Sequence, residues 1–86
     1  MFTISYLAQV VKKDIPSLPT RMKVVIRKAI ETRLALDPVG FGKPLQYSLK
    51  NHRRLRVGDY RVVYRIEEQT VLIIAIKHRK EVYSKF

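Results

Sequence analysis

The fold is decided by one stretch of the chain, RRLRVGDYRVVYRIEEQTVLIIAIK, which runs from Arg53 to Lys77. It contains three runs rich in β-branched and aromatic residues, which is typical of strands. Gly58-Asp59 separates the first two runs and favours a two-residue hairpin, and Glu67–Thr70 forms a polar turn before the third. The expected strands of this antiparallel meander are Arg53–Val57, Tyr60–Ile66 and Val71–Lys77.

The third run is apolar at every position from Val71 to Ile76. A strand with one face in water alternates apolar and polar residues, so this pattern indicates a strand that is covered on both faces. We therefore expect an interior strand, with helices packed against one face of the sheet.

A long amphipathic helix is expected in the N-terminal half. Between Met22 and Leu36 apolar residues recur at spacings of three and four, which places them on one face. Asp37-Pro38 ends this helix, because proline lacks the backbone N–H and clashes with the preceding turn. Val39–Pro44 contains two glycines and is expected to be a loop. The apolar face consists of Met22, Val25, Ile26, Ala29, Ile30 and Leu34.

Two shorter elements are expected before that helix. Apolar and polar residues alternate over Phe2–Tyr6, which predicts a strand, and Leu7–Asp14 is expected to be a short helix with Val10 and Val11 inward. Strand, helix, helix and then consecutive strands is the order of an α+β domain, in which helices lie on one side of an antiparallel sheet. A chain of 86 residues has room for one core, so residues 1–86 are expected to form a single domain.

The charge of the chain points to an anionic partner. Lys and Arg number 18 against 7 acidic residues, and the net charge of +11 is spread over both halves of the sequence. Such a density of positive charge attracts polyanions. Nucleic acid is the first partner to consider, an anionic membrane surface the second, and an acidic protein is compatible with both.

Several classes of site are disfavoured by the composition. No cysteine is present, which excludes disulfides and thiolate metal sites and suits a reducing cytoplasm. His52 and His78 are far apart and the few acidic residues do not cluster at ligand spacing, so we expect no metal and no cofactor. The N-terminus lacks the pattern of a signal peptide and no apolar run reaches spanning length, so a cytoplasmic protein without a membrane partner is expected.

Arginines are expected to gather on one face of the sheet. Strand alternation places Arg54 and Arg56 on one face, and Arg61 and Arg65 share a face of the next strand. Each of them alone could be a solvated charge. Several like charges on adjacent strands repel one another, however, so the set favours an anionic ligand such as phosphate, which a guanidinium binds through two hydrogen bonds.

The segment after the interior strand could carry chemistry. His78, Arg79 and Tyr83 would emerge at one end of the sheet. Cleavage of RNA by transesterification needs a base, charge stabilisation at phosphorus and an acid, and these three side chains can supply them without metal. Taken singly, His78 could be a surface imidazole and Tyr83 a packing aromatic, and Tyr60 and Tyr64 are expected in the core.

The same segments carry a family resemblance. The motifs over Arg53–Tyr64 and His78–Tyr83, at the distance that separates them in this sequence, resemble those of the RelE/ParE toxin superfamily, and more closely those of its RelE-type branch. The resemblance extends from the first strand to the C-terminus. The resemblance implies two N-terminal helices on a four-stranded, mostly antiparallel sheet. It also implies an mRNA endoribonuclease that acts typically in the ribosomal A site, and a cognate antitoxin that wraps the toxin. The segments are Pro44-Leu45, Leu49-Lys50, Arg53–Tyr64 and His78–Tyr83.

The resemblance also implies roles for single residues. Arg61 would neutralise phosphate, Arg79 would stabilise the transition state, Tyr83 would stack on a base or assist proton transfer, and His78 would be a general acid or base. Two positions depart from the family pattern, because Asn51 and Lys77 stand where many relatives have glycine. The expected phosphate-binding residues are Arg54, Arg56 and Lys50.

Two other functions fit the same residues. A ParE-like toxin that poisons DNA gyrase needs no RNase residues, and a non-catalytic RNA-binding module that arrests growth needs only the basic sheet. The partner is expected to be an acidic antitoxin that folds on binding and covers Arg61 and Arg79, because a chain of net charge +11 suits an acidic, partly disordered segment.

Overall fold

A five-stranded sheet forms the centre of the protein in the computed structural model, which describes residues 1–46, 48 and 51–81. The strands lie in the order β1-β5-β4-β3-β2. β1 pairs in parallel with β5, and the other neighbours are antiparallel. The strands are β1 (Thr3–Tyr6), β2 (Lys43–Pro44), β3 (Arg53–Val57), β4 (Tyr60–Glu67) and β5 (Thr70–His78).

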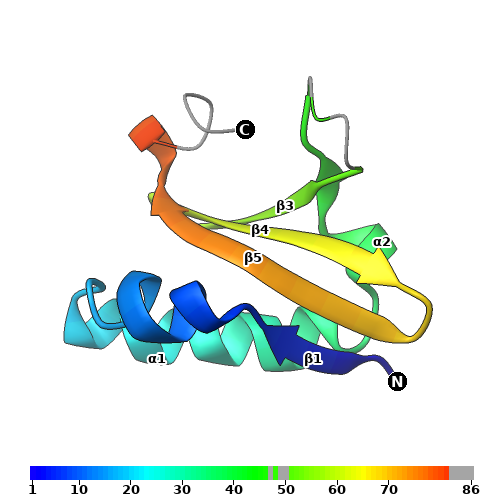
Figure 1. The fold of residues 1–86 in the computed structure, drawn as a ribbon, viewed down its shortest axis with the longest axis horizontal. Coiled ribbons are helices and arrows are strands. Elements are labelled where there is room, and N and C mark those ends of the chain that lie inside the picture. Colours follow the sequence, from blue (N-terminus) through cyan, green and yellow to red (C-terminus); the bar gives the residue numbers. More distant parts are fainter. Residues whose placement is uncertain (47, 49–50, 82–86) are drawn as a thin grey trace.

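The helical segments lie mainly on one side of the sheet. Figure 1 shows α1 and the preceding short helix on the same side of β3, β4 and β5. η1 and η2 are single π-helical turns, in which Ile15 N–H donates to Val10 O and Ala35 N–H donates to Ile30 O. The helical segments are η1 (Val10–Asp14), α1 (Thr20–Ala29), η2 (Ile30–Leu34) and α2 (Pro38–Phe41). The α+β class and the helix-covered sheet are thus confirmed.

The main core lies between these helices and the sheet. It joins Ile26 of α1 and Ile30 of η2 to Val62 and Tyr64 of β4 and Ile73 of β5, all buried. A smaller cluster of Leu45, Val63 and Ala75 lies on the other face. β5 lies between β1 and β4, which confirms the interior strand expected from its apolar run.

The prediction that Val39–Pro44 forms a loop is wrong. Asp37 begins a new helix instead, because its Oδ1 accepts the backbone N–H of Gly40 at 2.9 Å and Pro38 occupies the first turn. Lys43–Pro44 then pairs with β3 as the short edge strand β2. β2 makes the sheet five-stranded where four strands were expected.

Two of the expected inward residues point outward. Val11 is 54% exposed and Val25 is 41% exposed, whereas their neighbours Val10 and Ile26 are buried. Consecutive helical residues are about 100° apart around the axis, so Val11 and Val25 lie at the margin of the face on which Val10 and Ile26 are buried.

A bulge in β5 decides which side chains of its C-terminal end face the helices. Val63 pairs with Ala75 but Tyr64 pairs with Ile73, so Ile74 has no partner in this ladder. Ile74 and Ala75 both pack in the outer cluster, and Ile76 returns to the helix side. Ala75, Ile76 and His78 therefore face the side opposite to the one that simple alternation from Ile73 predicts.

Candidate nucleic-acid interface

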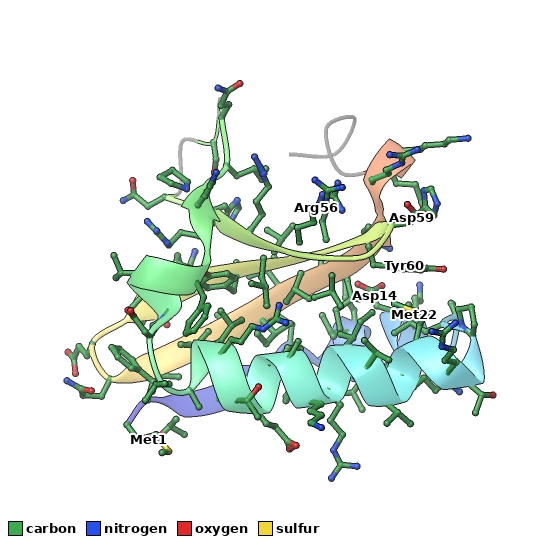
Figure 2. All side chains as sticks on the ribbon, turned by 180° about the vertical axis from the view of Figure 1, so that it is seen from behind. Met1, Asp14, Met22, Arg56, Asp59 and Tyr60 are labelled. Carbon is green, nitrogen blue, oxygen red and sulfur yellow. The ribbon has the colours of Figure 1, made fainter. Side chains whose placement is uncertain are left out.

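Basic side chains gather in a hollow of about 240 Å³ on the sheet face away from α1. Cross-strand pairing brings them together, because Arg56 lies opposite Arg61 and Lys43 lies opposite Arg54. Figure 2 shows Arg56 on the far side of the sheet from Met22 of α1. The clustering expected from strand alternation is confirmed for three arginines. We call this site the arginine hollow; its lining residues are Phe41, Lys43, Arg54, Arg56 and Arg61.

Every charged residue that lines the arginine hollow is basic. Arg56 is exposed and Arg54 is half-buried. Like charges on neighbouring strands destabilise a sheet, so the arrangement favours an anion that several guanidinium groups share. A phosphodiester fits this chemistry, because the planar guanidinium donates two parallel hydrogen bonds to it.

Arg61 is the most enclosed of these cations, with 9% of its surface exposed. Its Nη1 donates to the carbonyl oxygens of Gly58 and Tyr60, each at 3.0 Å. These bonds hold the guanidinium against the β3–β4 turn, where Gly58 has a φ of 59°. The two-residue hairpin expected at Gly58-Asp59 is thus present, and of its two turn residues only Gly58 has a positive φ.

Two other arginines of the sheet have structural roles. Arg53 Nη2 donates to Val39 O at 2.9 Å and to Gly42 O at 3.1 Å, which ties α2 to β3. Arg65 Nε donates to Glu67 Oε2 at 2.8 Å, and Arg65 does not line the arginine hollow. Arg65 therefore differs from Arg61, with which it shares a strand face.

His78 lies apart from the arginine hollow. It pairs with Tyr60 on the helix side of the sheet, and the two rings meet edge to face with centroids 5.5 Å apart. Its imidazole lines a separate hollow of about 210 Å³ that includes Asp14 and Leu18. The structure therefore does not bring His78 and Arg61 together, because Tyr60 and Arg61 are consecutive on β4 and point to opposite faces.

A backbone contact orients the His78 ring. Nδ1 accepts the N–H of Lys80 at 3.2 Å. In the neutral imidazole this assigns the proton to Nε2, since Nδ1 acts as the acceptor.

Arg79 lies at the end of the sheet, beside the β3–β4 turn. Its N–H donates to Asp59 O at 2.8 Å, and its Nε is 3.9 Å from Asp59 Oδ1. Both side chains are more than half exposed, so this ion pair contributes little to stability. Two further predicted site residues, Lys50 and Tyr83, lie outside the described residues.

The two departures from the family pattern have local explanations. Asn51 has a φ of 57°, a conformation that asparagine adopts more readily than most residues, so it can replace a glycine there. Lys77 Nζ lies 3.0 Å from Asp14 Oδ1, and Asp14 Oδ2 also accepts the N–H of Ile76. Lys77 thus anchors the strand that carries His78.

Two lining residues of the arginine hollow were missed in the sequence. Phe41 and Lys43 lie in the segment that we expected to be a loop. The available signal was Asp37-Pro38, because Asp before Pro also begins helices as cap and first residue. That signal would have placed Phe41 in the first turn of a helix and not in a loop.

Tyr64 of β4 attaches α2 to the sheet through a hydrogen bond. Its hydroxyl donates to Pro38 O, and the side chain is fully buried as expected. Burial raises the pKa of the Tyr64 phenol above its ordinary value of 10.0, and the adjacent Arg53 offsets part of the increase.

Metal-ligating residues are not grouped in the described part of the chain: no three His, Cys, Asp or Glu side chains lie close enough to hold an ion. In residues 1–46, 48 and 51–81 there is also no helix with the length and apolarity to cross a membrane.

The fold and the arginine hollow define a small α+β domain with a cationic sheet face, and comparisons with known proteins identify its family. The family model for the ParE toxin of the type II toxin-antitoxin system parDE matches residues 7–83. Toxin RelG of Mycobacterium tuberculosis is 32% identical over 76 residues, which are 86% of this chain and 87% of that protein.

Solved structures agree with this result. The chain is similar to one in the toxin-antitoxin complex RelBE2 from Mycobacterium tuberculosis, with a TM-score of 0.81, 30% identity and coverage of 91% of this chain and 98% of that one. It is also similar to a chain in the archaeal RelE-RelB complex from Pyrococcus horikoshii, with a TM-score of 0.63, 26% identity and coverage of 91% of this chain and 94% of that one. The chain belongs to the RelE/ParE superfamily of type II toxin-antitoxin toxins.

Proposed function

We propose that this toxin is a metal-independent endoribonuclease that cleaves mRNA, on the ribosome, in the cytoplasm. The observation that carries the proposal is the arginine hollow, in which Arg54, Arg56 and Arg61 come from two paired strands and none of the described lining residues is acidic. Such a site has the charge and the donor geometry for a phosphodiester. Membership of the toxin superfamily supports RNA as the source of that phosphate.

In the proposed reaction the RNA 2′-hydroxyl attacks the adjacent phosphorus. A base takes the hydroxyl proton, the new bond to the 2′-oxygen forms, and the bond to the 5′-oxygen breaks as that oxygen receives a proton. The products are a 2′,3′-cyclic phosphate and a 5′-hydroxyl. Arg61 and Arg79 would stabilise the charge at phosphorus, with Arg54, Arg56 and Lys50 as phosphate contacts.

Proton transfer is assigned to His78 and Tyr83. Because His78 lies on the helix side, its role requires that the RNA pass round the end of the sheet at Gly58-Asp59, where Arg79 also lies. The two roles can be separated. A proton-transfer residue affects the rate of cleavage more than the binding of RNA, whereas loss of a phosphate contact weakens binding and lowers its salt dependence.

The test is cleavage of ribosome-bound mRNA by purified toxin in EDTA. We expect cleavage by the wild type, and a loss of about 100-fold or more for Arg61→Ala and Arg79→Ala, in the range of a lost transition-state donor. His78→Ala should lower the rate without weakening binding of an uncleavable RNA. Intact mRNA with the wild type in EDTA would contradict the proposal.

An acidic antitoxin is the proposed partner. The RelBE2 and RelE-RelB structures contain antitoxins with the toxins that this chain resembles. The net charge of +11 and the exposed arginine hollow suit an acidic segment that folds on binding. We propose that it covers Arg79 and the arginine hollow, Arg61 included, and a complex in which the exposed Arg56 and Arg79 both stay open to solvent would contradict this.

A second candidate is inhibition of DNA gyrase. The separation of His78 from the arginine hollow favours it, because gyrase inhibition needs no assembled RNase site, and the matching family model is that of a ParE toxin. A supercoiling assay with added toxin distinguishes the two. Inhibition of supercoiling together with intact ribosome-bound mRNA would establish this alternative.

A further inference from the structure

One lining residue of the arginine hollow is aromatic. Phe41 is 48% exposed and lines the hollow together with Lys43, Arg54, Arg56 and Arg61. We propose that Phe41 is a stacking platform for an unpaired RNA base, placed beside the phosphate that the arginines bind. This inference rests on the proposed function, since it names how the same site holds the nucleotide.

Phe41 is held in place by bonds on both sides of it. Asp37 accepts the N–H of Gly40, and Phe41 N–H donates to Asp37 O at 3.1 Å. Arg53 donates to the carbonyl oxygens of Val39 and Gly42. Because these bonds already fix the backbone at Phe41, stacking of a base on the ring needs no further ordering of the backbone.

The chain after Phe41 is also fixed against the sheet. A Cβ added at Gly42 would overlap the Tyr64 hydroxyl and lie 3.0 Å from Arg54 O. The close approach therefore requires glycine, and it fixes the path between Phe41 and β2. Tyr64 is itself bonded to Pro38 O, so the whole of α2 is attached to β4.

The chemistry of the lining favours a nucleotide over an apolar protein residue. A phenyl ring among four cations matches a ligand with a flat apolar face and an adjacent anion, which describes a nucleotide. The base must be unpaired, because the faces of a paired base are stacked on its neighbours. Phenylalanine has no hydrogen-bonding group, so we expect a preference for strongly stacking bases and not for one base.

Binding of an uncleavable RNA tests this assignment. The probe is a short single-stranded 2′-O-methyl RNA with a fluorescent label, made also as a set in which an abasic site is moved along the strand. The proteins are full-length wild type, Phe41→Leu, Phe41→Trp and Arg54→Gln. Val39→Ala is the matched control, because Val39 is 60% exposed on the same helix and does not line the hollow.

We expect Phe41→Leu to weaken binding about tenfold, as for the loss of one stacked base, with Phe41→Trp and Val39→Ala close to wild type. One abasic position should weaken binding to the wild type and not further weaken binding to Phe41→Leu. Arg54→Gln should reduce the salt dependence of binding, and Phe41→Leu should leave it unchanged.

The outcomes distinguish this inference from the proposed function. If Arg54→Gln reduces the salt dependence but Phe41→Leu binds every probe like the wild type, Phe41 does not stack and the inference is overturned alone. The inference is also overturned if Phe41→Leu binds every abasic probe more weakly than the wild type by the same factor, because Phe41 then contacts no particular base position of the strand. If the wild type binds no RNA at low salt, both fall. Loss of antitoxin binding with unchanged RNA binding assigns Phe41 to a protein contact and also overturns the inference.

Discussion

Asp14 and Lys77 form an ion pair of 3.0 Å that joins η1 to the end of β5 across 63 positions of sequence. The Asp14 side chain is buried and also accepts the N–H of Ile76. β1 ends at the pair Tyr6 and Ile73, and beyond this point no strand of the described residues pairs with β5 on that side. Asp14 thus takes the place of a neighbouring strand where β5 leads to His78.

Removal of the Asp14 carboxylate should destabilise the protein strongly. We expect Asp14→Ala to lower the free energy of unfolding by about 3 kcal/mol, because it leaves the Ile76 N–H without its acceptor and Lys77 without its counter-ion. Urea unfolding measures this. The control is Glu31→Ala, which removes the exposed pair with Arg27 and should cost about 0.5 kcal/mol or less. Equal losses for the two variants would show that Asp14 has no special role.

Tyr64→Phe should weaken the attachment of α2 and alter the stability at alkaline pH. Loss of the bond to Pro38 O is expected to cost about 1 kcal/mol at neutral pH. Because burial raises the pKa of Tyr64 above 10.0, its stabilising contribution is present below pH 10.0 and decreases as the pH rises beyond it. The difference between wild type and variant should therefore shrink above pH 10.0. A difference that is constant up to the most alkaline stable pH would contradict this.

Asn51 should tolerate glycine but not a β-branched residue. Its φ of 57° is disfavoured for most side chains, so Asn51→Val is expected to cost about 1 to 2 kcal/mol, whereas Asn51→Gly should be within about 1 kcal/mol of wild type. Thermal or urea unfolding of the two variants checks this. Similar stability of both would mean that the backbone at this position adopts another conformation.

The sequence predicted the elements whose signals are local. Strand β3 has the predicted bounds, and β4 and β5 differ by a residue at their ends, since turn residues and alternation define them. α2 and β2 were missed because Asp37-Pro38 was interpreted only as the end of one helix, although the same residues begin another. The same error explains why four strands were predicted and not five.

The candidate site was predicted in part. Alternation on β3 and β4 brought Arg54, Arg56 and Arg61 together correctly, because their face depends only on positions within regular strands. The face of the sheet on which His78 lies could not be predicted from alternation. The bulge at Ile74 reverses the alternation of β5, and it appears only when the pairing of Val63 and Tyr64 is known. A sequence pattern that is apolar on both faces contains no signal for such a bulge.

The most direct test of the arginine hollow compares two arginines of the sheet. Arg56 lines the hollow and is exposed, whereas Arg65 is paired with Glu67 outside it. The measurement is the rate of cleavage of ribosome-bound mRNA in EDTA by wild type, Arg56→Ala and Arg65→Ala. We expect a loss of about tenfold or more for Arg56→Ala, from a charge-assisted phosphate contact, and a rate close to wild type for Arg65→Ala. Equal rates for Arg56→Ala and wild type, or an equal loss for both variants, would contradict this prediction.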